Sequence, residues 1–386
     1  MQDSILKIEK NIWQSFETEK RIGLLTGLSG IALFYSKMYT IYKLEDYLIK
    51  LTKVVEKVNE IIENEPSSST LCSGLAGFGL ALLHLEDHLI EIDTEYFEVI
   101  DSILLDDFRS FNQSNNYDFL HGSMGIAMYF IERCKYTKNE NLISELNQFA
   151  EDLVNKISTD LKEVLTTETA LDNDDKFCIY FGLAHGVAGY LNFLIYLERN
   201  FAELKSDIDT SLKIGIAFLQ SYKNYNDNSK QYYPNLLLLE SGSIINSRLS
   251  WCQGDFGISN ALFNCGAYLE EDHLIKESEK LIQAARAISL EESLVSDFGL
   301  CHGSTGIALQ YYLASKKLNI DCSEEIEKWL NIIHEQTSDY ETFSSYEKGR
   351  YKSESNLLEG TVGLALTLFT LENKIDSKWL ELINLF

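Results

Sequence analysis

The sequence predicts an all-α protein of the α/α toroid class, a double-layered barrel in which an inner ring of helices is surrounded by an outer ring. A Gly-x-x-Gly step followed by an apolar run recurs seven times, and the segments between these steps are amphipathic. Only two prolines occur in 386 residues, as a nearly all-helical chain requires. The recurring glycine pairs are Gly27/Gly30, Gly74/Gly77, Gly122/Gly125, Gly186/Gly189, Gly254/Gly257, Gly303/Gly306 and Gly360/Gly363.

The inner helices are predicted directly after the glycine pairs. Residues 31–34, 80–83, 126–129 and 364–366 are apolar on nearly every side, and a helix that is apolar all round must be buried. Because glycine lacks a Cβ, seven helix ends can crowd around one axis, and the loop before each helix can take a positive φ. We therefore expect seven inner helices whose entrances lie together.

The outer helices are predicted between the glycine pairs. From Tyr47 to Ile62 the apolar residues follow i, i+3, i+4 spacing, with Lys, Glu and Asn between them, which indicates a helix with one buried face and one wet face. An open solenoid is the alternative arrangement. Closure is favoured because solenoids usually end in irregular polar caps, whereas the first and last repeats here resemble the middle ones.

The evenly spread repeats predict a single domain over residues 1–386, although the length alone permits two or three. No segment approaches about 18 consecutive apolar residues, so no membrane span is expected. The first residues lack the basic and apolar regions of a signal peptide. Seven cysteines without regular spacing argue against a disulfide framework and for a reducing compartment. These features predict a cytoplasmic protein.

The charge balance excludes one class of partner. A formal net charge of −26 makes nucleic-acid binding improbable, because phosphate contacts need clustered Lys and Arg. The simplest interpretation is that the acidic surface keeps the protein soluble. The sharper hypothesis is that its field attracts a cationic substrate.

Chemistry-bearing residues recur at one register of the repeat. Cysteines stand two residues before the first glycine of repeats two, five and six, and histidines stand one residue before it in repeats three, four and six; they are Cys72, Cys252, Cys301, His121, His185 and His302. All six belong to loops that enter inner helices, so they face the same end of the toroid.

Ring geometry selects three of the six as a zinc site. Repeats five and six are neighbours, so Cys252, Cys301 and His302 can converge within the roughly 2.0–2.3 Å bond lengths that zinc demands. Three protein ligands leave one coordination position open, which is typical of catalytic rather than structural zinc. Repeat two lies across the ring, so Cys72 is expected to be a small buried hydrophobe. His121 is too distant for the same metal and is expected at a helix start or in the cavity wall.

The remaining candidates lie close to this site in the ring. His185 comes from the repeat next to the metal pair and is either a fourth ligand or a free imidazole that handles protons near neutral pH. Asp118 and Arg248 precede the first glycines of repeats three and five and flank the same end, where they can also simply pair with each other. Trp251 either covers the ligand Cys252 or lines a substrate cleft. The four cysteines outside this register are interpreted as structural: Cys134, Cys178, Cys265 and Cys322.

Three motifs together carry a family resemblance. Ala184-His185-Gly186, Ser250-Trp251-Cys252-Gln253-Gly254 and Cys301-His302-Gly303, set in seven Gly-x-x-Gly repeats, resemble the LanC lanthipeptide cyclases over the whole chain. The length resembles that of the stand-alone cyclases rather than the fused enzymes with a dehydratase domain. One residue departs from the family pattern, because Gln253 stands where the family usually has tyrosine. An amide forms hydrogen bonds but cannot act as an acid.

The resemblance implies a zinc-dependent reaction. Cys252, Cys301 and His302 would hold one Zn²⁺, and His185, Asp118 and Arg248 would be needed for turnover. A peptide cysteine would add to a dehydroalanine or dehydrobutyrine of the same peptide and form a (methyl)lanthionine thioether. The implied partners are a dehydrated precursor, a dehydratase and an ABC exporter, and any membrane association would arise through such a complex.

Three other functions are compatible with parts of this pattern. A LanC-like zinc protein that only captures peptide or glutathione thiols is the non-enzymatic alternative. Protein prenyltransferases also combine a toroid with thiol-activating zinc, but they need a diphosphate surface rich in Lys and Arg. A toroidal glycosidase would use paired carboxylates without a metal.

Overall fold

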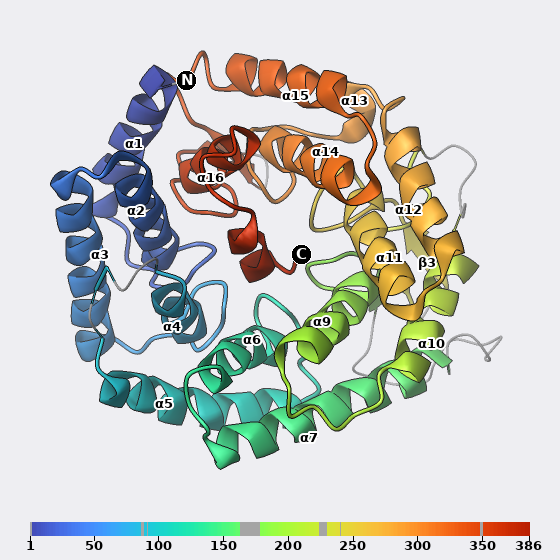
Figure 1. Ribbon diagram of the computed structural model, residues 1–386. Coiled ribbons are helices and arrows are strands. Elements are labelled where there is room, and N and C mark those ends of the chain that lie inside the picture. Colours follow the sequence, from blue (N-terminus) through green and yellow to red (C-terminus); the bar gives the residue numbers. More distant parts are fainter. Residues whose placement is uncertain are drawn as a thin grey trace.

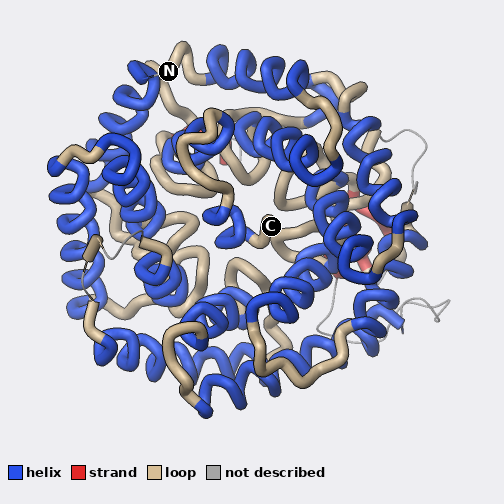
Figure 2. The backbone as a smooth tube through the Cα atoms, in the orientation of Figure 1, coloured by secondary structure: helices blue, strands red, loops and turns tan. Residues whose placement is uncertain are grey.

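The computed structural model describes residues 2–85, 89–90, 92–162, 178–223, 230–239, 241–347 and 350–386. The helices form two concentric rings, one inside the other, around a common axis (Figure 1, Figure 2). The inner helices are α2 (Leu28–Tyr42), α4 (Leu75–Leu83), α6 (Ser123–Cys134), α9 (Val187–Asn200), α11 (Asp255–Leu269), α14 (Ser304–Leu318) and α16 (Thr361–Leu371). The α/α toroid predicted from the sequence is therefore confirmed. The single domain over residues 1–386 stays a prediction.

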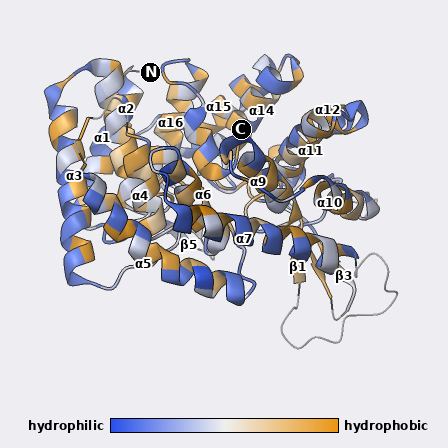
Figure 3. Ribbon diagram, turned by 60° about the horizontal axis from the view of Figure 1, so that its bottom comes forward, coloured by the Kyte–Doolittle hydropathy of each residue, from blue (hydrophilic) through white to orange (hydrophobic). Residues whose placement is uncertain are grey.

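The outer ring and the short elements complete the chain. The outer helices are α1 (Gln2–Phe16), α3 (Glu45–Asn64), α5 (Thr94–Gln113), α7 (Glu140–Lys156), α10 (Asp209–Ser221), α12 (Asp272–Ala285) and α15 (Ser323–Gln336). The short helical elements are a π-helix η2 (Ile157–Leu161), α13 (Leu290–Ser293) and a 3₁₀-helix η3 (Lys378–Ile383). Figure 3 shows polar and apolar residues alternating along the outer helices. No helix in the described part of the chain is both long and apolar enough to cross a membrane.

Two small antiparallel sheets add to the all-α expectation. Strands β1 (Cys178–Tyr180), β2 (Leu236–Leu238) and β3 (Ser243–Ile245) pair in that order, with Tyr180 opposite Leu236 and Leu236 opposite Ile245. Strands β4 (Ser345–Glu347) and β5 (Arg350–Lys352) form a separate pair. The first sheet matters for the site because β1 leads directly into the loop before α9.

Burial follows the predicted periodicity. In α3 the buried residues are Tyr47, Leu51, Val54 and Val58, which are spaced three or four apart and face the inner ring. By contrast, ten consecutive residues of α16, from Thr361 to Thr370, are buried. Each fully buried leucine-sized side chain contributes roughly 1.5–3 kcal/mol. Burial of one face of the outer helices and every face of the inner helices therefore favours the closed ring.

The glycines at the helix entrances act mainly by removing a Cβ. A Cβ on Gly306 would lie 2.0 Å from the Leu300 carbonyl oxygen. A positive φ, which the sequence suggested for every entrance, occurs only at Gly254, where φ is 80°. The first glycines of the other six pairs have extended backbone that any residue can adopt. The conformational freedom of glycine is therefore used at one entrance, and close packing rather than backbone handedness demands glycine at the other six positions.

The seven loops that enter the inner helices are connected by main-chain hydrogen bonds. We number them loop one to loop seven: residues 21–27, 68–74, 116–122, 180–186, 248–254, 297–303 and 354–360. Six of the seven junctions between neighbouring loops carry a backbone bond: Leu24 N to Leu71 O, Cys72 N to Leu120 O, Ala184 N to Cys252 O, Trp251 N to Cys301 O, Cys301 N to Leu358 O and Leu358 N to Leu25 O. The last of these joins loop seven to loop one, so the ring closes. Among the described residues, no such bond joins loop three to loop four.

The C-terminal segment fills the centre of the ring, which the sequence pattern did not predict. The chain end lies near the axis in Figure 1. Asn384 is fully buried, and its amide donates to the Gly189 carbonyl at 3.1 Å, while Asn192 donates to the Asn384 carbonyl at 2.7 Å. The Phe386 ring packs 5.7 Å from the Tyr196 ring, centroid to centroid. These contacts anchor the segment to the inner face of α9.

Candidate functional site

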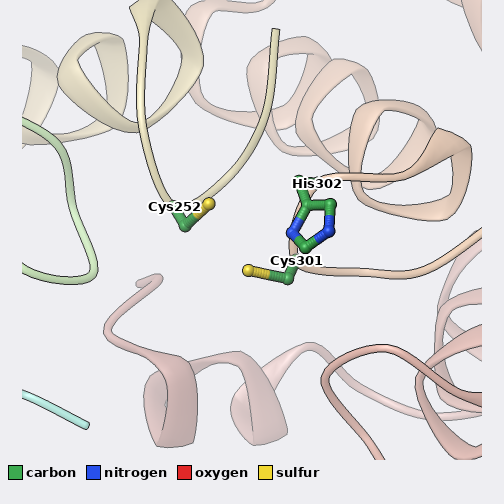
Figure 4. Close-up of side chains that lie close together, drawn as sticks. All are labelled: Cys252, Cys301 and His302. Atoms are coloured by element: carbon green, nitrogen blue, oxygen red, sulfur yellow. The ribbon is translucent and has the colours of Figure 1, made fainter. Parts of the chain in front are cut away.

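Loops five and six bring Cys252, Cys301 and His302 together. One ligand atom from each residue lies within 4.8 Å of the other two. Figure 4 shows both sulfur atoms and the imidazole ring converging from two neighbouring loops. The bond from Trp251 N to Cys301 O, at 3.2 Å, fixes the two loops next to each other. The convergence predicted from the repeat register is therefore present in the structure.

The Cys301 thiol has the largest effect on the ionisation of Cys252. A hydrogen bond from the Cys301 thiol holds the pKa of Cys252 well below its ordinary value, against the effect of burial, and His302 and Ser250 act in the same direction. Burial lowers the pKa of His302, but its hydrogen bond with Cys252 and the charge of that sulfur raise it above its ordinary value. Such mutual stabilisation of a thiolate is typical of residues that bind a metal.

The group offers three ligands. Within the described part of the chain, no further His, Cys, Asp or Glu ligand atom belongs to the cluster. His185, which the sequence left open as a fourth ligand, is not a member. Two soft sulfurs and an imidazole nitrogen suit zinc, and a three-ligand site keeps one position open.

Ser250 supports Cys252 and was missed by the sequence reasoning. Its hydroxyl lies 3.6 Å from the Cys252 sulfur, donates to the Gln253 carbonyl at 2.8 Å and accepts from the Gln253 N–H at 3.2 Å. The side chain is fully buried. The sequence feature that could have identified Ser250 is a hydroxyl residue two positions before a metal-ligand candidate, in a tight turn. Ser250 therefore sets the shape of the turn that presents Cys252.

Asp118 pairs with His185 across the junction between loops three and four. The Asp118 Oδ2 lies 2.6 Å from the His185 Nδ1, so the carboxylate accepts a hydrogen bond when that nitrogen is protonated. The other oxygen of Asp118 accepts from the backbone N–H groups of Leu120 at 2.9 Å and His121 at 2.7 Å. The carboxylate is thus held by its own loop and aimed at the neighbouring one.

The pair stabilises a charged imidazole. Burial lowers the pKa of His185, but the hydrogen bond and charge of Asp118 outweigh it and raise this pKa above its ordinary value. Burial raises the pKa of Asp118, and His185 again outweighs it, so the pKa of the carboxyl is lowered. The Nε2 is the ring nitrogen that Asp118 does not bind.

Arg248 lies beside the cysteines rather than in an ion pair with Asp118. Its positive charge lowers the pKa of both Cys301 and His302, which places it near the metal-ligand group. No described residue forms an ion pair with it. The simple Asp118–Arg248 pairing considered from the sequence is absent from the described residues, because His185 takes the carboxylate.

Two further rings flank His185. The His121 ring is nearly parallel to it, with centroids 6.2 Å apart and planes 13° apart. The Tyr180 ring at the end of β1 lies 6.2 Å from it at 56°. Tyr180 was missed, since β1 lies outside the glycine repeat. His121 directly precedes Gly122 at the start of α6, and its ring lies beside that of His185.

The other expected residues lie where a structural role places them. Cys72 is buried, and burial raises the pKa of its thiol to about 11. Trp251 is fully buried, so it does not line an open cleft. All seven cysteines are free thiols, and the four outside the register take no part in the metal-ligand group.

The chain is similar to known proteins along nearly its whole length. The model of the family described as "Lanthionine synthetase C-like protein" matches residues 18–383. The nisin biosynthesis protein NisC of Lactococcus lactis subsp. lactis is 24% identical over 387 residues, covering 94% of this chain and 88% of that protein. The lacticin 481/lactococcin biosynthesis protein LcnDR2 of the same organism is 24% identical over 75% of this chain, which matches 33% of that longer protein.

The solved structure of nisin cyclase superposes on the whole chain. The TM-score is 0.77 at 21% identity, and the match covers 100% of this chain and 98% of the other. At this level of identity the likeness establishes the toroidal fold.

Proposed function

The chain belongs to the lanthionine synthetase C-like family, and from this we propose that it is a lanthipeptide cyclase. It joins a cysteine of a dehydrated precursor peptide to a dehydroalanine or dehydrobutyrine of the same peptide, forming a thioether ring. The similarity to a nisin biosynthesis protein along 94% of the chain supports this function. The observation that carries it is the convergence of Cys252, Cys301 and His302 from loops five and six.

These three residues would hold one zinc ion. The donor set fits, because two sulfurs and one imidazole nitrogen lie within 4.8 Å of one another and the second sulfur favours ionisation of Cys252. When bound, the ion lowers the pKa of a peptide thiol at its open position and so supplies the nucleophile.

His185, positioned by Asp118, takes up the proton that the thiol releases. Asp118 fixes the His185 Nδ1 and leaves Nε2 free to take that proton. The peptide sulfur then forms a bond to the β-carbon, and the electron pair of the C=C bond moves onto the enolate. His185 returns a proton to the α-carbon, so the reaction consumes and releases none. General acid–base help of this kind is worth about 10²–10⁴-fold.

Arg248 stabilises the negative charge that develops on the enolate oxygen. Its guanidinium is half-buried beside the metal-ligand group and has no ion-pair partner among the described residues. A fixed cation in a partly desolvated site stabilises such charge better than water does. Gln253 follows Cys252 and offers an amide but no acid, so we assign proton transfer to His185 alone.

The test is ring formation on a dehydrated lanthipeptide precursor. Wild-type protein is expected to consume free peptide thiols catalytically, measured by alkylation and mass spectrometry. The Cys301→Ala variant should lose both zinc and activity, whereas Cys134→Ala, a half-buried cysteine outside the site, should keep both. Thiol capture in stoichiometric amounts without rings would instead identify a thiol-binding protein. A Cys301→Ala variant with one full equivalent of zinc would contradict the assigned ligands.

The proposed setting follows from the same function. The partners are the dehydrated precursor and, as a biosynthetic complex, a dehydratase and an ABC exporter, with the protein in the cytoplasm. Co-purification with an exporter or dehydratase expressed from the same strain tests the complex.

A further inference from the structure

Tyr180 is the last residue of β1 and the first residue of loop four. Its ring centroid lies 6.2 Å from that of His185, and the two ring planes are 56° apart. Tyr180 is 40% exposed, and the His185 side chain is exposed to the same extent. A tyrosine ring therefore presents open surface beside the imidazole to which we assign proton transfer.

The repeat places Tyr180 at the position that Arg248 occupies in the next loop. Each residue stands six positions before the first glycine of its pair, Gly186 or Gly254. The backbone agrees, because a Cβ on either glycine would lie 2.3 Å from the carbonyl oxygen of the corresponding residue. The two loops are also joined by a backbone hydrogen bond. Tyr180 thus lies at the same end of the toroid as the residue to which we assign enolate stabilisation.

The hydroxyl of Tyr180 already has a partner. It forms a hydrogen bond with the side chain of Cys178, which lies two residues earlier on the same face of β1. The pairing of Tyr180 with Leu236 holds the backbone of the same residue in the sheet. What Tyr180 offers a ligand is therefore a flat apolar ring in a held position rather than a free hydroxyl.

The proposed reaction brings a flat group to this position. Dehydration of serine or threonine turns a tetrahedral α-carbon into an sp² carbon, so the dehydroamino acid is planar and conjugated with its amide. Planar π-systems pack on aromatic rings in offset stacks, whereas a tetrahedral α-carbon keeps a residue further from the ring face. Because the α-carbon must lie at His185 to receive its proton, the planar residue lies next to Tyr180.

We propose that Tyr180 binds the dehydroamino acid by stacking, and so selects dehydroalanine or dehydrobutyrine over the serine or threonine from which each derives. This assignment rests on the proposed cyclase function. It makes Tyr180 a substrate-binding residue that transfers no proton. Selection at this position keeps the undehydrated segments of a precursor away from His185.

The first experiment measures binding without catalysis, by fluorescence anisotropy. Two labelled peptides are compared: a dehydrated precursor whose cysteines are replaced by alanine, and the same peptide with its serines and threonines intact. We expect wild type to bind the dehydrated peptide about three- to tenfold more tightly, the range of one aromatic stacking contact. Tyr180→Phe should keep this ratio. Tyr180→Leu is apolar but not flat, so its ratio should fall close to one.

Turnover and a matched control separate this role from a structural one. With the complete precursor, Tyr180→Leu should raise KM by the same factor and leave kcat and zinc content unchanged. Tyr346→Ala is the control, because Tyr346 is 39% exposed on strand β4 and its ring packs on Tyr351. This variant should keep the wild-type binding ratio and the wild-type KM.

Three results would overturn the assignment. The first is a wild-type protein that binds both peptides equally. The second is a Tyr180→Leu variant that keeps the wild-type ratio, since a flat ring would then not be needed. The third is a Tyr180→Phe variant that loses the ratio, which would assign the selection to the hydroxyl. Failure of the proposed function is distinguishable, because a wild-type protein that selects the dehydrated peptide but forms no rings would refute the cyclase alone.

Discussion

Replacing Gly254 with alanine should damage the metal-ligand group through the backbone. Gly254 caps the N-terminus of α11 two residues after Cys252, with φ 80° and ψ −167°. That combination is adopted almost only by glycine and costs a residue with a Cβ about 1–3 kcal/mol. In addition, a Cβ built at this position would lie 2.3 Å from the Arg248 carbonyl oxygen.

The steric contact adds to the backbone cost. The carbonyl oxygen in the way belongs to the main chain and cannot rotate aside, so loop five itself must shift. Overpacking of this kind costs about 1–3 kcal/mol more. We therefore expect the free energy of unfolding to fall by about 2–6 kcal/mol. Because the displaced loop carries both Arg248 and Cys252, zinc affinity should fall by at least about tenfold, the equivalent of roughly 1.4 kcal/mol.

The chain supplies a matched control for this substitution. Gly242 also has a positive φ, 63°, but a Cβ there would meet nothing within 4 Å. Gly242→Ala should therefore cost only the left-handed backbone, about 1–2 kcal/mol, and leave zinc affinity unchanged. The two variants are compared by urea unfolding and by competition with a colorimetric chelator. Equal stability and equal zinc affinity of Gly254→Ala and wild type would refute the reasoning.

Four further measurements test the site and the role of the surface charge. Asp118→Asn should slow ring formation about 10²-fold without loss of zinc. It should also move the acidic limb of the pH profile of kcat to lower pH, because the Asp118 carboxylate raises the pKa of His185. An unshifted limb would assign that limb to another group. The same pair should stabilise the fold most between the ordinary Asp118 value of 3.8 and the ordinary His185 value of 6.5. The contribution is lost as pH falls through the lowered pKa of Asp118 and as pH rises through the raised pKa of His185. Thermal unfolding of wild type and Asp118→Asn across pH measures it. Ser250→Ala should weaken zinc binding about tenfold in chelator competition, as loss of hydrogen bonds to a metal ligand does. The control is Ser247→Ala, which should bind zinc like wild type because the Ser247 hydroxyl donates to the Tyr233 carbonyl instead. Finally, the net charge of −26 should speed the capture of a cationic peptide at low salt, and a capture rate indifferent to ionic strength would remove that role.

The repeat register predicted the site where neighbours in sequence are neighbours in space. The convergence of Cys252, Cys301 and His302 could be predicted because repeats five and six are consecutive and each loop enters its helix in the same way. The outer helix predicted from Tyr47 to Ile62 extends from Glu45 to Asn64 for the same reason, since one apolar stripe specifies one buried face.

Features outside the repeat could not be predicted in this way. Tyr180 reaches His185 because β1 pairs with β2, nearly sixty residues further along the chain. The buried Asn384 contacts α9 from a segment without any glycine pair. Likewise, the choice of His185 rather than Arg248 as the partner of Asp118 depends on which way each side chain turns, and the sequence pattern carries no information about that.

The ring of backbone hydrogen bonds that joins the seven loops is interrupted between loops three and four, and this affects which thioether macrocycles the proposed enzyme could form. Backbone bonds run from loop four through loops five, six, seven, one and two to loop three, so loops five and six, which carry the metal-ligand group, are each bonded to both neighbouring loops. Between loops three and four, Asp118 and His185 are joined only by side chains. In the proposed reaction the α-carbon is bonded to the attacked β-carbon, so its distance from the sulfur is the same in every thioether macrocycle, and ring size can change only the direction in which the α-carbon faces the proton donor. An enzyme with a fixed anchor for sulfur and an adjustable proton donor can therefore close small and large macrocycles with one set of residues.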